Sequence, residues 1–144
     1  MSFLITFALQ AWADCPQDDS YEDNDSAQEA ADLNSNAESN LYVCDSDEDW
    51  FWVSGTEGEL LTIDAIFSHV DGDIDLKLYA TNDWENPLSS AVTVSDNETL
   101  SYMVETSGSY YLQVFYFSAV NTGSNRYDLS VTSGTAPDFL SDPY

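Results

Sequence analysis

The chain has 144 residues, 43% of them hydrophobic and 14% aromatic, so it is long enough for one domain with a buried core and too short for two. Charge is the outlier, because 27 acidic residues face one lysine, Lys77, and one arginine, Arg126, for a formal net charge of −25. Nucleic acids and anionic membrane surfaces require a basic patch, which this composition cannot build, so both are excluded as partners. Divalent ions, cationic partners, a saline habitat or plain solubility remain as explanations of the charge.

The first thirteen residues carry no charge and include the short apolar run 3–9. Ala11-Trp12-Ala13 matches the small-x-small pattern of a signal peptidase site. The segment is too short to span a membrane. Residues 1–13 are therefore predicted to be a signal peptide with a truncated basic start, which makes the protein secreted, either extracellular or periplasmic. The alternative is an apolar N-terminal strand.

The chain contains two cysteines, Cys15 and Cys44. In an oxidising compartment two such thiols are expected to pair. Closing a loop of about 30 residues would stabilise the fold by roughly 3–4 kcal/mol on the chain-entropy model. With only one distant histidine, His69, the pair makes a poor zinc site. A Cys15–Cys44 disulfide is therefore predicted.

Two acidic clusters lie about twenty residues apart, at 18–26 and at 45–49. Carboxylates packed this densely repel one another unless a cation lies among them. A hard cation with oxygen ligands is the simplest solution, and Ca²⁺ fits better than Mg²⁺, which keeps more of its waters. The clusters predict a calcium site. The alternative is an acidic loop beside a solvated strand edge.

Beyond the first cluster, the segment 27–33 is predicted to be a short helix with Ser26 as its N-cap. Later segments alternate apolar and polar residues with turn residues between them, which is typical of strands in an antiparallel sandwich or jelly roll. The run 110–117 is apolar on both faces and is expected to be a central strand. The expected strands are 41–44, 50–53, 59–67, 74–79, 91–94, 100–104, 110–117 and 127–131.

These features predict one all-β module, an antiparallel β-sandwich with a jelly-roll-like arrangement, over residues 14–134. Residues 135–144 contain two prolines and are predicted to be a flexible tail.

No motif for a catalytic site is present: the sequence has neither G-x-S-x-G nor H-E-x-x-H, and His69 is the single histidine. The protein is therefore predicted not to be an enzyme.

Aromatic side chains are too numerous for one inner face of a sandwich, so some are expected on the outer face. Exposed aromatics of this kind suit collagen, peptide or sugar binding. The alternative is that they are core residues or lie under a covered edge. The candidate ligand face consists of Tyr79, Tyr111, Phe115 and Phe117.

Five segments, in order and with matching spacing, resemble the bacterial pre-peptidase C-terminal domain: 21–26, 47–53, 72–79, 107–114 and 127–131. The first resembles the family's "Y-E-P-N-D-S" opening, and the second its "D-x-D-W/Y-F-x-V" strand. The resemblance implies a jelly-roll-like β-sandwich that is a non-catalytic accessory module of secreted proteins. It also implies calcium at the N-terminal segment, and its collagenase-attached members bind collagen.

The positions that match the family's calcium motif are Glu22, Asn24, Asp25, Asp47 and Asp49. Two positions depart from the motif: Asp23 stands where proline is usual, and Ser20 stands where calcium-binding members have a further acidic ligand. Asp18 or Asp19 could replace that ligand.

Together these observations predict a non-catalytic binding module of a secreted bacterial protein, ordered by calcium at its acidic N-terminal segment. Its partner would be an extracellular protein or polysaccharide, and it would be a monomer or one module of a larger protein. One alternative is a structural spacer or folding aid without a ligand. The other is a carbohydrate- or collagen-binding module with an outer aromatic face.

Overall fold

A computed structural model describes residues 19–33, 37–45, 47–117 and 123–136. These residues form nine strands and one 3₁₀ turn, η1. The elements are β1 (Ala31–Asp32), β2 (Ala37–Cys44), β3 (Asp49–Gly55), β4 (Glu59–Ile66), η1 (His69–Asp71), β5 (Asp73–Ala80), β6 (Ser89–Ala91), β7 (Glu98–Met103), β8 (Gly108–Phe117) and β9 (Ser124–Thr135).

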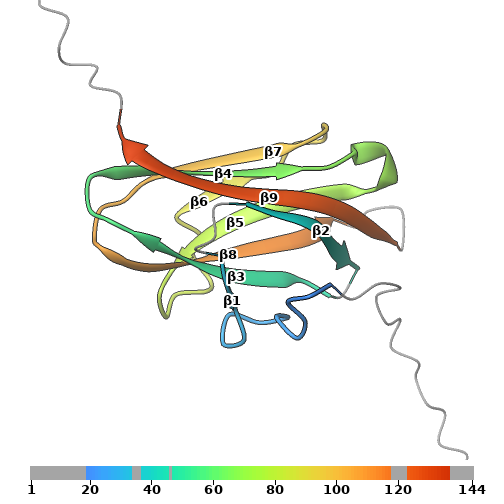
Figure 1. Ribbon diagram of the computed structural model, residues 1–144, viewed down its shortest axis with the longest axis horizontal. Coiled ribbons are helices and arrows are strands. Elements are labelled where there is room, and N and C mark those ends of the chain that lie inside the picture. Colours follow the sequence, from blue (N-terminus) through green and yellow to red (C-terminus); the bar gives the residue numbers. More distant parts are fainter. Residues whose placement is uncertain (1–18, 34–36, 46, 118–122, 137–144) are drawn as a thin grey trace, which may run out of the picture.

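The strands form two stacked sheets (Figure 1). One sheet has the order β1-β3-β8-β5-β6, and the other has the order β2-β9-β4-β7. Every pairing is antiparallel except that of β1 with β3, which is parallel. The predicted all-β class and the antiparallel two-sheet sandwich are therefore confirmed.

Period-two alternation explains which face each strand buries. In β8, Leu112 and Val114 point inward and are fully buried, whereas Tyr111 and Gln113 lie on the outer face and are half-buried. The strand pairs with β3 on one side and β5 on the other, which confirms that 110–117 is a central strand. The core between the sheets is made of such inward side chains, with Phe51, Ile63 and Leu76 all fully buried.

The predicted helix over 27–33 is wrong. In its place the chain makes a single turn, in which the Glu29 amide donates to the Ser26 carbonyl, and then enters β1. The Ser26 hydroxyl does donate to the Glu29 carboxylate, so the expected cap residue is engaged, but in a turn. The strand edge of β3 offers backbone partners, and Leu33, which donates to the Trp52 carbonyl, is buried in the core. These tertiary contacts outweigh the weak preference of a short alanine-rich segment for helix.

The predicted strand 91–94 is also misplaced, because β6 ends at Ala91. After Ala91 the chain leaves the five-stranded sheet and crosses to β7 in the four-stranded sheet. Val92 and Val94 therefore lie in the crossing loop, where they are 56% and 81% exposed. The apolar residues Val92 and Val94, whose alternation predicted a strand, therefore do not form a buried face.

The last strand, β9, reaches Thr135, just past the predicted module boundary at residue 134. The predicted signal peptide, residues 1–13, lies outside the described residues, as do 137–144 of the predicted tail. Among the described residues, no helix has the length and apolar character needed to cross a bilayer.

The turn η1 is held in place by backbone contacts and by one buried side chain. The Asn125 amide group donates to the carbonyls of Ser68 (2.9 Å) and Gly72 (2.8 Å). Gly72 adopts φ 143° and ψ 152°, a region that only glycine occupies without strain. A Cβ there would also overlap the Tyr116 ring.

Gly72→Ala is expected to lower the free energy of unfolding by about 1–3 kcal/mol, because alanine is strained at this φ and meets the Tyr116 ring. Urea unfolding curves measure this. The matched control is Gly134→Ala, where a Cβ has no atom within 4 Å, and a change of less than about 0.5 kcal/mol is expected. Equal effects at the two positions would contradict the geometry of the turn.

Candidate metal centre

The N-terminal segment, residues 19–30, is attached to the sandwich by specific polar contacts. The Asp19 carboxylate accepts from the amides of Tyr21 (2.8 Å) and Tyr42 (3.1 Å), so it joins the segment to β2. The Asn24 carbonyl accepts from the Trp50 amide (2.8 Å), and the Asn24 side-chain amide donates to the Trp50 carbonyl (3.2 Å). The Asn24 pair of bonds therefore extends the β3 edge with a residue of the first acidic cluster.

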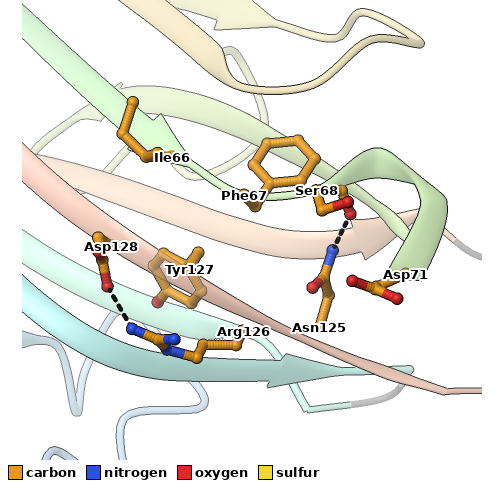
Figure 2. Close-up of a pocket in the computed structure, with 8 residues that line it drawn as sticks. All are labelled: Ile66, Phe67, Ser68, Asp71, Asn125, Arg126, Tyr127 and Asp128. Atoms are coloured by element: carbon orange, nitrogen blue, oxygen red, sulfur yellow. Dashed lines mark hydrogen bonds and ion pairs between the residues drawn. The ribbon is translucent and has the colours of Figure 1, made fainter.

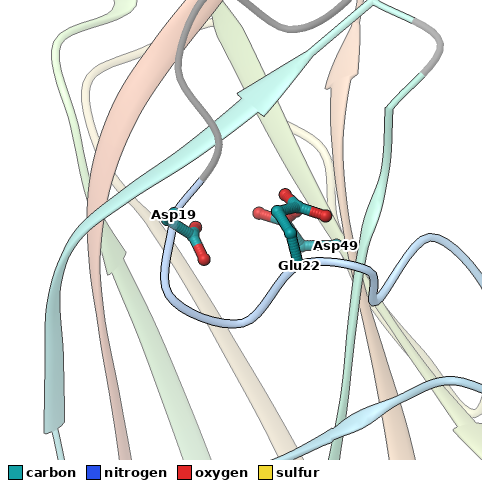
Figure 3. A group of neighbouring side chains, drawn as sticks. All are labelled: Asp19, Glu22 and Asp49. Carbon is teal, nitrogen blue, oxygen red and sulfur yellow. The ribbon is translucent and has the colours of Figure 1, made fainter.

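This attachment brings the two acidic clusters together. Two sets of carboxylates have oxygen atoms within 4.8 Å of one another: Asp19 with Glu22 and Asp49, and Glu22 with Asp25 and Asp47. Glu22 belongs to both sets. Figure 3 shows the Glu22 and Asp49 carboxylates side by side, with Asp19 across from them on the same loop as Glu22. The potential ligand atoms of both sets are carboxylate oxygens, which is the donor type that hard cations prefer.

Several oxygens in this region are buried and lack a hydrogen-bond donor among the described residues. They are Glu22 Oε1, Asn24 Oδ1 and Asp49 Oδ1. Asn24 and Asp49 are each only 1% exposed. Buried acceptors normally find a donor, and leaving one without a partner costs about 1–3 kcal/mol, more for a charged group. Three such acceptors at the junction of the two clusters fit a cation site.

The electrostatics point the same way. Burial, together with the charges of Asp47, Asp19 and Asp25, raises the pKa of Glu22 to about 7. Burial, together with the charges of Asp19, Glu22 and Asp47, raises the pKa of Asp49 to about 8, although the Tyr127 hydroxyl acts in the opposite direction by donating to its Oδ2. Protein groups alone therefore leave both carboxylates poorly compensated as anions.

All five predicted metal ligands lie in this region. The structure brings Glu22, Asp25, Asp47 and Asp49 into the two carboxylate sets, and it buries the Asn24 side chain beside them. Asp19, one of the two proposed substitutes, joins the first set, whereas Asp18 lies outside the described residues.

Tyr127 is a residue of this site that the sequence did not reveal. It comes from β9 in the opposite sheet, is 1% exposed, and its hydroxyl donates to Asp49. The available signal was its inward position in an alternating strand, because a buried tyrosine hydroxyl usually needs a partner.

The candidate ligand face is only partly open. Tyr79 is 5% exposed and packs against Trp50, with the ring centroids 5.5 Å apart, while Ala27 of the N-terminal segment completes this buried cluster. Trp84 closes over Tyr111 with ring centroids at 4.7 Å. These rings form a small second core on the outer face of the five-stranded sheet.

The remaining residues of the candidate face are more accessible. Phe115 is half-buried beneath the Lys77 ammonium, which lies 4.7 Å from the ring centroid, and Phe117 is 53% exposed. A ligand role for the set Tyr79, Tyr111, Phe115 and Phe117 stays a prediction.

Cys44, the last residue of β2, is 4% exposed and lies next to the second acidic cluster. Its predicted partner, Cys15, lies outside the described residues, so the disulfide stays a prediction. His69, the only histidine of the chain, is half-buried, and its Nδ1 lies 3.2 Å from the Asp73 carboxylate.

Comparisons with known proteins identify the fold. Neither the protein-family models nor the curated protein sequences contain a match to this chain. Among solved structures, the chain is similar to the pre-peptidase C-terminal domain of a collagenase from Bacillus anthracis, with a TM-score of 0.55, 18% sequence identity, and coverage of 72% of this chain and 92% of that one. It is also similar to PliG of Aeromonas hydrophila, a periplasmic inhibitor of g-type lysozyme, with a TM-score of 0.57, 13% identity, and coverage of 69% and 87%.

The resemblance to the pre-peptidase C-terminal domain that the sequence motifs indicated is thus confirmed by the structural comparison, at the level of the fold.

Among the described residues, two buried carboxylates lie outside the candidate metal centre, Glu98 and Asp75, and Glu98 accepts from the Thr93 amide (2.7 Å). Asp75 in β5 is 6% exposed, and its Oδ1 has no hydrogen-bond partner among the described residues. Burial and the charges of Asp73 and Glu98 raise its pKa to about 6, against the opposing effect of Lys77. Because the folded-state pKa lies above the ordinary value of 3.8, Asp75 favours the folded state most below that value, and this contribution is lost as the pH rises through about 6.

The free energy of unfolding of the parent protein is therefore expected to fall between about pH 4 and about pH 7. Asp75→Asn should make this fall smaller by roughly 1–2 kcal/mol. The full pKa change corresponds to about 3 kcal/mol, and solvent at the sheet surface screens part of it. Urea unfolding of both proteins across this range, in constant calcium, isolates the Asp75 contribution. Glu57→Gln, an exposed carboxylate, is the control, and a slope unchanged in Asp75→Asn would show that this carboxylate does not titrate as argued.

Proposed function

We propose that this protein is a non-catalytic binding module of an exported protein, and that Ca²⁺ orders its N-terminal segment. The observation that carries the proposal is the set of buried, unpartnered oxygens of Glu22, Asn24 and Asp49 beside the two carboxylate sets. The fold likeness to a domain of a collagenase and to a lysozyme inhibitor supports a module that binds other proteins outside the cytoplasm.

The residues that would hold the ion are Asp19, Glu22, Asn24, Asp25, Asp47 and Asp49. Bound calcium would supply positive charge among these carboxylates. The chain itself supplies the connection to the fold: Asn24 holds Trp50 at the start of β3, and Tyr21 packs edge-on against Phe51, with the centroids 5.6 Å apart. Neutralising the clusters would therefore stabilise the attachment of residues 19–30 to the sandwich.

Calcium is expected to raise the melting temperature in a specific way, because a ligand that binds only the folded state stabilises it. At a calcium concentration of about 100 times the Kd, the gain is about 2.7 kcal/mol, or roughly 5–10 °C for a chain of this size. The measurement is a thermal melt at fixed ionic strength in EDTA, in calcium and in magnesium.

Two variants sharpen this test. Asp25→Asn removes an exposed member of the second carboxylate set and is expected to abolish most of the calcium effect while leaving the melt in EDTA nearly unchanged. Glu57→Gln removes one exposed charge elsewhere and should keep the full effect. Identical melting curves in EDTA, calcium and magnesium would rule out the calcium site and leave a sandwich with a solvated acidic junction.

The predicted disulfide belongs to the same proposal, since a Cys15–Cys44 bond would attach the chain just before the first cluster to the end of β2, next to the second. We expect the denatured, unreduced protein to show no thiol that reacts with a thiol reagent, and two after reduction. Reduction should lower the free energy of unfolding by roughly 3–4 kcal/mol. Reactive thiols in the unreduced protein from an oxidising preparation would contradict the pairing.

A further inference from the structure

Two neighbouring loops at one end of the sandwich hold exposed valines. Val70 in η1 is 87% exposed, and Val94 in the crossing between β6 and β7 is 81% exposed, with Val92 at 56%. In Figure 1 the η1 turn and the β6–β7 crossing lie at the same end of the molecule. We name Val70, Val92 and Val94 the valine tip.

The valine tip rests on a firmly bonded backbone. The two loops are joined by side-chain acceptors of one loop and amides of the other: the His69 amide donates to Asp96 Oδ1 (2.8 Å), and the Phe67 amide donates to Asn97 Oδ1 (2.9 Å). From the opposite side, the buried Asn125 holds both ends of η1. Loops fixed in this way present the valines to solvent in a constant arrangement, which lowers the entropy cost of binding.

Acidic residues lie close to the valine tip along the chain. Asp71 and Asp96 are exposed beside it, and Asp73 follows directly. Next to η1 lies a groove of about 270 Å³ with Ile66 and Phe67 on its apolar side and with Asp71 and Asp128 among its polar residues (Figure 2). Arg126 also lines this groove, where its guanidinium makes a long 3.5 Å contact with Asp128.

Apolar groups beside acidic residues fit one class of partner. A second copy of this chain would bring a further charge of −25 to the contact, and nucleic acids or anionic lipids would likewise be repelled. A protein segment with apolar side chains flanked by lysine or arginine could pack its apolar side chains on the valines and pair its positive charges with the carboxylates.

We propose that the valine tip and the adjoining acidic groove form the docking surface for a basic protein segment with apolar residues beside its lysines or arginines. This inference rests on the binding-module part of the proposed function and does not depend on calcium. Loops at the end of a sandwich are well suited to this role, because the rigid sheets position them while their side chains stay free for contact.

The test is selection of a phage-displayed library of random dodecapeptides on the immobilised protein, followed by affinity measurement with the selected synthetic peptides. We expect peptides enriched in lysine or arginine next to apolar residues. Their affinity should fall at least tenfold for the double variant Val70→Ser/Val94→Ser. It should change less than about twofold for Leu88→Ser/Met103→Ser, which alters two side chains of 40% and 41% exposure away from the tip.

Charge is tested separately with Asp71→Lys against Glu57→Lys, two exposed acidic positions. Asp71→Lys should weaken peptide binding several-fold more than Glu57→Lys, which changes the net charge by the same amount. Only Asp71→Lys should also reduce the salt dependence of peptide binding. Thermal melts of every variant check that the fold is kept, as expected for exposed positions.

The outcomes separate the two proposals. Peptides that bind the Val70→Ser/Val94→Ser protein as tightly as the parent, or that lack basic residues, would overturn the docking surface and leave the binding module standing. No enriched peptide at all would overturn the docking surface alone, because a module that recognises a folded protein need not bind a dodecapeptide. The thermal melt in calcium tests the metal site independently of either result.

Discussion

The structure depends on the burial of the Asp49 carboxylate at the first position of β3. This residue lies where three parts of the chain meet: the N-terminal segment brings Glu22 and Asp19 to it, β9 brings the Tyr127 hydroxyl, and the next residue, Trp50, is bonded to Asn24. A buried carboxylate needs hydrogen bonds or an opposite charge to stay ionised. Tyr127 supplies one hydrogen bond, whereas the neighbouring carboxylates of Asp19, Glu22 and Asp47 oppose ionisation, so the proposed cation would supply the charge that Asp49 lacks.

The acidic junction is connected to the outer aromatic cluster by a chain of hydrogen bonds. Glu48 accepts from the Trp50 indole (3.2 Å) and from the Gln113 amide group (2.6 Å), and Gln113 in turn accepts from the Tyr79 hydroxyl (2.9 Å). Ala27, only two residues after Asp25, packs on the same rings. The acidic clusters and the surplus of aromatic residues therefore belong to one arrangement on the five-stranded sheet.

Most strands were predictable because each has one fully buried face, and a strand of this kind shows an apolar residue at every second position of the sequence. The errors occur where local pattern and tertiary demand differ. Ala27 to Leu33 fits a helix locally, but the open edge of β3 and the core position of Leu33 require a turn and a strand. Val92 and Val94 alternate like strand residues, yet the chain is changing sheets there. The acidic site was predictable from cluster spacing and motif resemblance, whereas Tyr127, far away in sequence, could be found only once the sheets were stacked.

The parallel pairing of β1 with β3 is short, and it has a consequence for how the molecules behave toward one another. With Asn24 and Leu33 it occupies the backbone groups along Trp50 to Trp52, a stretch of aromatic residues at the border of a sheet. An uncovered strand of this composition is a template to which a strand of another molecule can add. Residues 24–33 thus also cover this strand edge, and conditions that release them would expose it to strands of other molecules.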